Sequence, residues 1–239
     1  KVDCLIVYLE VAVSNMMLED SVIGKLINHF WEIPPSQMKE FLKNNSLGIS
    51  DVKELPTLEE AVEAMLAGNA VFFMDGYDQA VKIAGKGYPA MMVGKAETEK
   101  VLRGSKEGFT DSVKINSALI RKRVKDTRLK VVERQMGVRS NTMLQLLYVE
   151  DLVQEDLLSE IQRRLDQFEI DGIFDSGMVE QLTEEVWYSP FPQFQSTERP
   201  DRAAMELLEG RIVLLCDNSP MALLLSLIHI SEPTRPEPI

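Results

Sequence analysis

The stretch TLEEAVEAMLAGNAVFFMDGYDQAVKI, Thr57 to Ile83, contains the signals for a helix, a strand and a turn in direct succession. Thr57 and Glu60 form a capping box, apolar residues follow at helical spacing, and Gly68 marks the end. These signals predict a helix over residues 57–67. AVFFMD then predicts a buried strand, and AVKIAG predicts the strand that returns beside it after a turn.

Two carboxylates, Asp75 and Asp78, lie three residues apart where the first of these strands ends. Carboxylate oxygens at such a spacing can bind a hard cation, but a calcium loop needs further acidic positions and a closing glutamate that are absent here. The sequence therefore favours a turn between two strands over an acidic site.

The same pattern recurs later in the chain. At an offset of 142 the stretch aligns with RPDRAAMELLEGRIVLLCDNSPMALLL, Arg199 to Leu225, and a weaker echo at an offset of 140 pairs IVYLE (residues 6–10) with LLYVE (residues 146–150). Six residues recur at the larger offset: Ala61, Leu66, Gly68, Val71, Asp75 and Ala80 as Ala203, Leu208, Gly210, Val213, Asp217 and Ala222. The repeat predicts an α/β protein with two α/β subdomains related by duplication, each with a mixed sheet flanked by helices.

Hydrophobic periodicity predicts further elements outside the repeat. CLIVYLE, at the start of the chain, predicts a strand and residues 17–30 predict a helix. GFTDSVKINSALIRKRV predicts a helix with Thr110 or Asp111 near its N-cap, and RLKVVERQMG predicts a strand. QEDLLSEIQRRLDQF and SGMVEQLTEEV predict two more helices.

These elements suggest a division of the chain into four parts. We expect a first α/β subdomain over 1–94, a basic connecting helix and strand over 95–140, and a second α/β subdomain over 141–225. The remaining residues, 226–239, change character abruptly, and residues 226–235 resemble the translation of a sequencing-library adaptor. We therefore expect this tail to be non-native and the natural chain to continue where it begins.

Composition indicates a globular protein, because 45% of its 239 residues are hydrophobic and no apolar run approaches the roughly 18 residues of a membrane helix. Two cysteines, far apart in the sequence, imply neither a disulfide framework nor a thiolate metal site. From the two isolated cysteines we expect a reducing compartment. The chain begins with lysine and shows no signal peptide, so we also expect it to be a fragment.

Charge is distributed unevenly along the chain. Residues 95–139 contain 13 Lys or Arg against 6 Asp or Glu, which gives +7, while the net charge of the whole chain is -12 and that of the rest is therefore -19. The basic segment is expected either to pack against acidic flanks of the same chain or to contact anionic lipid or an acidic partner subunit. Nucleic acid is disfavoured because the chain as a whole is acidic.

Motifs for catalysis or nucleotide binding are incomplete. The glycines around Lys86 and Lys95 resemble phosphate loops, but Pro89 stands where the Walker pattern needs its first glycine and Ala96 where it needs Ser or Thr. Ser176 lacks a base, since His29 is the one histidine outside the suspect tail, and a helix cap at Asp175-Ser176-Gly177 is favoured. We predict no catalytic residue, no metal site and no cofactor.

The basic segment supplies the candidate site residues. RGSKEGF and RKRVKD place several guanidinium groups near one carboxylate, which suits an ion-pair network that fixes two elements or two subunits. A site for a small anionic ligand is the alternative. The candidates for an interface or an anion site are Arg103, Glu107, Arg121, Arg123 and Arg139.

Several strings in this order resemble the A subunit of the GerA family of spore-germination nutrient receptors, in its soluble N-terminal region. They are VFFMDGYDQA, RG-x-x-EGF, INSALIRKRVKD, FDSGMVEQL, and PFPQ followed by TERPD and LLEGR. Each string alone is weakly specific, whereas their order and spacing together are highly specific. The chain departs from the family pattern at Ser105, where a proline is usual, and at GYPAMM.

The resemblance implies a non-enzymatic role in receptor assembly and signal coupling during spore germination. It implies B and C subunits and other A subunits as partners, and a spore inner membrane location through a C-terminal membrane domain absent here, with this domain on the spore core side. A small-molecule-binding regulatory module, with its ligand between the subdomains, is the alternative. A hydrolase would need a base that the sequence hardly offers.

Overall fold

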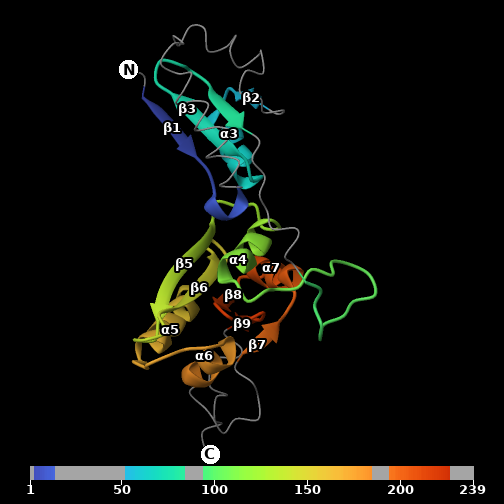
Figure 1. The fold of residues 1–239 in the computed structure, drawn as a ribbon, viewed down its shortest axis with the longest axis vertical. Helices are drawn as coiled ribbons and strands as arrows, with labels where there is room; N and C mark the ends of the chain where they lie inside the picture. Colours follow the sequence, from blue (N-terminus) through green and yellow to red (C-terminus); the bar gives the residue numbers. More distant parts are fainter. Residues whose placement is uncertain (1–2, 14–51, 84–93, 185–193, 227–239) are drawn as a thin grey trace, which may run out of the picture. The chain divides into compact units, whose positions relative to one another are not determined.

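The structure is a computed structural model, and it describes residues 3–13, 52–83, 94–184 and 194–226 (Figure 1). The chain divides into two units, residues 1–89 and 90–239. The helix expected over 17–30, His29, the glycines around Lys86 and nearly all of the C-terminal tail lie outside the described residues.

The first unit contains a four-stranded antiparallel sheet in the order β1-β3-β4-β2. Its elements are β1 (Cys4–Val7), the 3-10 turn η1 (Glu10–Ala12), β2 (Val52–Leu55), α3 (Leu58–Leu66), β3 (Ala70–Met74) and β4 (Ala80–Ile83). Helix α3 packs Ala61 and Ala64 against Val71 of β3 and Ala80 of β4. The predicted helix and strands of this stretch are confirmed, and Thr57 caps the helix by accepting the Glu60 N–H at 3.2 Å.

The second unit contains a five-stranded antiparallel sheet in the order β5-β6-β8-β9-β7. Its strands are β5 (Leu129–Met136), β6 (Thr142–Val149), β7 (Gln195–Thr197), β8 (Ile212–Cys216) and β9 (Ala222–Leu225). Its helices are α4 (Val113–Arg121), α5 (Glu155–Asp166), α6 (Ser176–Thr183) and α7 (Pro200–Leu208).

Helices cover both faces of this second sheet. All five residues of β8 are buried, and because side chains alternate across a strand, they divide between two cores. Val213 and Leu215 join the core under α4 and α7, while Leu214 and Cys216 join the core under α5 and α6. The unit is therefore a three-layer sandwich, with α4 beside α7 on one face of the sheet (Figure 1).

The duplication predicted from the sequence is seen in the strand registers. The bounds of α3, β3 and β4 become those of α7, β8 and β9 when 142 is added to every residue number. Strand β1 pairs with β3 as Cys4 with Met74, and β6 pairs with β8 as Leu144 with Cys216. The offset is thus 140 for the first strand and 142 for the second, which explains why the sequence shows two offsets.

The turn after each paired strand also repeats. Gly76 and its counterpart Asn218 both have positive φ, of 79° and 64°, a conformation open to Gly and Asn. The Asp75 N–H donates to Asp3, and the Asp217 N–H donates to the carbonyl of Met143, in both cases at 2.9 Å. The turn predicted at Asp75 is confirmed.

Three details differ from expectation. Every strand pairing among the described residues is antiparallel, where mixed sheets were expected. Short strands β2 and β7 were not predicted, because neither carries an alternating apolar pattern. The N-cap of α4 is Ser112 rather than Thr110 or Asp111, and the capping acceptor is remote: Asp217 Oδ1 accepts the Val113 N–H at 3.0 Å.

The segment over 95–140, expected as a connection between subdomains, is built into the second unit. Strand β5 forms an edge of its sheet through eight residue pairs with β6, and α4 contributes Leu119 and Ile120 to one of its cores. The unit division given by the structure falls after residue 89.

We predict that Gly210→Ala destabilises the second unit by at least about 2 kcal/mol. Gly210 ends α7 with φ +83°, and a Cβ there would lie 2.5 Å from the carbonyl oxygen of Leu152. Urea unfolding of the 239-residue chain measures the loss. Gly94→Ala is the matched control, because Gly94 has no positive φ and nothing within 4 Å of its Cβ position; equal losses in both variants would contradict the prediction.

Candidate interaction site

Residues 94–111 form a long loop that leads into α4, and two separate sets of charged contacts fix it to the second unit. We call it the anchored loop. It contains Arg103 and Glu107, two of the site residues that the sequence singled out, and its base is closed by an isolated bridge between Lys95 and Glu107. In Figure 1 it follows the last grey segment before α4, projects outward past α7 and returns to α4.

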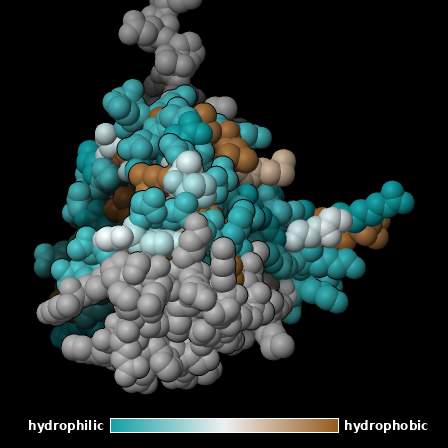
Figure 2. All heavy atoms as spheres, turned by 90° about the horizontal axis from the view of Figure 1, so that it is seen from above, coloured by the Kyte–Doolittle hydropathy of each residue, from teal (hydrophilic) through white to brown (hydrophobic). Residues whose placement is uncertain are grey.

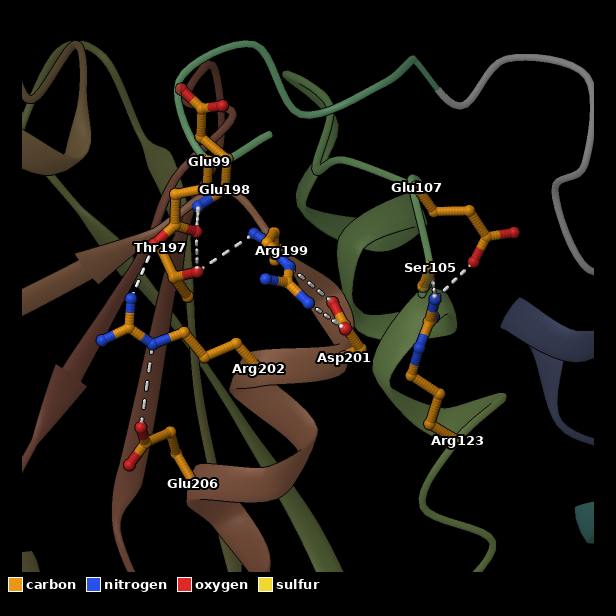
Figure 3. Close-up of polar contacts among 10 residues, drawn as sticks. All are labelled: Glu99, Ser105, Glu107, Arg123, Thr197, Glu198, Arg199, Asp201, Arg202 and Glu206. Atoms are coloured by element: carbon orange, nitrogen blue, oxygen red, sulfur yellow. Dashed lines mark hydrogen bonds and ion pairs between the residues drawn. The ribbon is translucent and has the colours of Figure 1, made fainter. Parts of the chain in front are cut away.

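The first anchor is the carboxylate of Glu107. It accepts hydrogen bonds from Lys122 Nζ at 2.9 Å and from Arg123 Nη2 at 2.5 Å, both at the C-terminal end of α4. Figure 3 shows the contact with Arg123. Arg123 is only 19% exposed, and it also donates to Ser105 Oγ at 3.1 Å and to the carbonyl of Leu119 at 2.7 Å. One guanidinium therefore joins two points of the loop to the helix end.

The electrostatics of Glu107 follow from this geometry. Burial alone would raise the pKa of its carboxyl, but hydrogen bonds and charge from Lys122 and Arg123 outweigh burial and hold the pKa below its ordinary value. The side chains remain partly open to water, so we assign the network only about 1 kcal/mol of stability.

The other site residues lie apart from this network. Arg121 is half-buried and donates to the carbonyl of Leu129 at 3.5 Å. Arg139 faces Asp171 across 3.6 Å with both side chains more than 80% exposed. Arg103 is exposed and makes no hydrogen bond or ion pair with any described residue. The structure thus brings together Glu107 and Arg123, with Lys122, and leaves the other three arginines separate.

The second anchor was missed in the sequence, although its residues lie in the TERPD string. Glu198, directly before α7, accepts the backbone N–H groups of Glu97 at 2.8 Å and Thr98 at 3.0 Å. Donation from the Thr98 N–H, above all, holds the pKa of the Glu198 carboxyl below its ordinary value. The Glu198 carbonyl also accepts the Phe109 N–H at 2.8 Å, so this one residue contacts both arms of the loop.

Glu99 completes the second anchor from the loop side. Its carboxylate accepts from the Thr197 hydroxyl at 2.5 Å and from Arg202 Nη1 at 2.6 Å (Figure 3). Arg202 lies 3.9 Å from Glu206 one turn along α7, and Arg211 pairs with the same Glu206 at 2.8 Å. The contacts span about a hundred residues in sequence, and spacing gives no signal for such a pairing.

The string RG-x-x-EGF now has a physical explanation. Gly108 is required because a Cβ there would lie 2.8 Å from the backbone nitrogen of Ala96 across the loop base. Phe109 is buried in the core under α4 and α7, and Gly104 turns the tip with φ +118°. Arg103, by contrast, has no role in holding the loop together.

Within the described ranges, no group of three or more His, Cys, Asp or Glu side chains could hold a metal ion. Asp175 caps α6 by accepting the Met178 N–H at 2.8 Å, and Ser176 Oγ shares a hydrogen bond with Ser219 Oγ at 2.7 Å. The interpretation of this Asp-Ser-Gly string as a helix cap is confirmed.

Among the described helices, none is long and apolar enough to cross a membrane.

We predict that Glu107→Gln lowers the free energy of unfolding by about 1 kcal/mol at pH 7 and by progressively less in acid. The folded-state pKa of Glu107 lies below its ordinary value of 4.5, so its contribution is present above that pH and is lost as pH falls through the folded pKa. Urea unfolding from pH 7 to pH 3 measures the difference between the two proteins. A difference that does not change with pH would contradict the assignment.

We predict that Glu198→Ala releases the loop base without unfolding the unit. Loss of a charged acceptor costs about 1.5 kcal/mol locally, which corresponds to roughly tenfold faster hydrogen exchange at the amides of Glu97 and Thr98. Glu209→Ala is the control, since Glu209 has only a 3.8 Å ion pair with Arg211. Unchanged exchange at both amides would show that Glu198 is not an anchor.

Comparison with known proteins places this fold and loop in a family. The family model described as Bacillus/Clostridium GerA spore germination protein matches residues 1–237. The chain is 35% identical over 218 residues to the uncharacterized membrane protein YfkQ of Bacillus subtilis, covering 91% of this chain and 42% of that protein. It is 31% identical over 219 residues to spore germination protein KA of the same organism, covering 92% and 40%.

A solved structure matches as well. The crystal structure of the N-terminal domain of the A subunit of the Bacillus megaterium spore germinant receptor GerK3 superimposes with a TM-score of 0.70 at 26% identity, covering 94% of this chain and 82% of that one. The chain spans about two fifths of the length of the two curated relatives described above. From the family match and these relatives we conclude that the chain belongs to the GerA family of spore germination proteins.

Proposed function

We propose that this chain is the N-terminal domain of a germinant receptor A subunit and that it works, without catalysis, in receptor assembly and signal coupling during spore germination. The family match and the likeness to the GerK3 A-subunit domain support the receptor assignment. The partners in this proposal are the B and C subunits and other A subunits. The full-length protein would lie in the spore inner membrane, with this domain on the spore core side.

The observation that carries the assembly role is the anchored loop. Glu107, Arg123, Glu99 and Glu198 are committed to contacts that fix the loop to α4 and α7, whereas Arg103 at the tip is exposed. A loop held rigidly at its base and charged at its tip loses little entropy when it binds a partner. Arg121 and Arg139 are further interface candidates outside the loop.

We predict that Arg103→Glu in the full-length protein lowers the amount of receptor in spore membranes or slows germination several-fold. The folded domain should stay within about 0.5 kcal/mol of the parent, because Arg103 supports no contact among the described residues. Immunoblotting of spore membranes, germination assays and urea unfolding measure the three quantities. Lys125→Glu is the matched control, an exposed cation outside the loop.

Normal receptor level and normal germination in the Arg103→Glu spores would contradict the proposed role of the loop. Calorimetry of the purified chain tests the competing function: heat on addition of small-molecule nutrients would support a ligand-binding regulatory module, whereas silence at millimolar concentration supports assembly.

A further inference from the structure

The tip of the anchored loop combines an unused apolar side chain with unopposed positive charge. Leu102 is 101% exposed, so it contributes nothing to either core of the second unit. Around it, Lys100, Arg103 and Lys106 are exposed, and residues 100–106 include no acid. We call these residues the basic tip. In Figure 2 hydrophobic surface lies among hydrophilic surface on the arm that projects from the body.

A surface of opposite character lies on the other helical layer of the same unit. Phe174 is 69% exposed in the segment before α6, and Glu169, Asp171 and Asp175 in the same segment, residues 169–175, are exposed as well. We call these four residues the acidic patch. Its backbone is fixed, because Thr142 donates its hydroxyl to the Ile173 carbonyl at 2.5 Å.

The basic tip and the acidic patch belong to opposite faces of one sheet. The loop runs into α4, and the carbonyl of Asp111 at its end accepts the Asn218 N–H at 2.7 Å. Helix α6, which follows the patch, is joined to the same β8–β9 turn through Ser176 and Ser219. The sheet and its two helical layers therefore separate these surfaces within one chain, and the exposure of Leu102 and Phe174 shows that neither is covered by the described part of its own chain.

We propose that the basic tip of one chain docks on the acidic patch of a second copy. Three cations meet three carboxylates, and Leu102 packs against the ring of Phe174, which removes apolar surface from water on both sides. The tip and the patch are different surfaces, so each copy can donate one and accept the other. This inference rests on the proposed assembly function of the loop and names its partner.

Lipid is the other chemistry that a leucine among cations could meet, and the observations favour protein. A second copy presents the exposed ring of Phe174 with three carboxylates in the same segment, of which Asp171 also faces Arg139 of its own chain across 3.6 Å.

Sedimentation of the 239-residue chain across a concentration series at low and high salt tests the contact. We expect self-association that weakens with salt, and at least a tenfold loss of affinity in Leu102→Asp, Arg103→Glu and Asp171→Arg, with Lys125→Glu unchanged. Unfolding temperatures control for misfolding, since all of these side chains are exposed. A mixture of the Arg103→Glu and Asp171→Arg chains should form mixed dimers, because each retains the surface that the other lacks.

A chain that stays monomeric throughout the series, or variants that associate like the parent, would overturn the inference. Vesicles of phosphatidylglycerol form a second arm: binding to them that Leu102→Asp abolishes, without self-association, would make the tip a lipid contact instead. If Arg103→Glu impairs germination while the chain remains monomeric, the proposed function survives and only the choice of partner fails.

Discussion

The second unit depends on one constraint, which is that its central strands are buried on both faces. β8 and β9 are buried along their whole length, so helices must cover the sheet on each side. The pair α5 and α6 covers one face, and the pair α4 and α7 covers the other. Helix α4 covers one face of the sheet beside α7, so the loop that precedes α4 has to pass α7. The charged contacts of Glu107 and Glu198 hold the loop in this position.

The turn that is repeated by the duplication has a different role in each of the two units. In the first unit the turn at Asp75 is exposed, whereas in the second the equivalent Asp217 caps α4. The backbone of the turn is the same in both, with a positive φ at Gly76 and Asn218. What differs is that Asp217 contacts α4, which lies outside the repeated stretch. The segment that carries α4, rather than the repeated stretch, therefore gives the second unit its distinctive surface.

The sequence predicted those parts of the fold that depend on residues close together in the chain. The helix at 57–67, its capping box and the two strands after it follow from spacing within about thirty residues, and the repeat carried the prediction to the second unit. Strands β2 and β7 were not predicted, because they are short and their positions are set by pairing with β4 and β9. The cap of α4 by Asp217 escaped because the two are about a hundred residues apart.

The candidate site was predicted less completely than the fold, for the same reason. Counting charges identified the basic segment and the region of Glu107, but it could not separate cations used internally from those left exposed. Arg128 and Lys130 pair with Asp151 and Glu150 in the turn directly after β6, as expected if a basic segment packs against acidic neighbours.

Once those pairs are removed, the remaining positive charge of the anchored loop is concentrated at its tip. Lys122 and Arg123 share the single carboxylate of Glu107, which offsets one of their two charges, and Glu99 is paired with Arg202. Three of the four cations in residues 94–111 lie at the tip with Leu102, namely Lys100, Arg103 and Lys106, while Lys125 is exposed elsewhere in the basic segment. A single exposed leucine is common on protein surfaces, so we infer a partner from the combination of Leu102 with the three cations of the tip and from the complementary charge of the acidic patch.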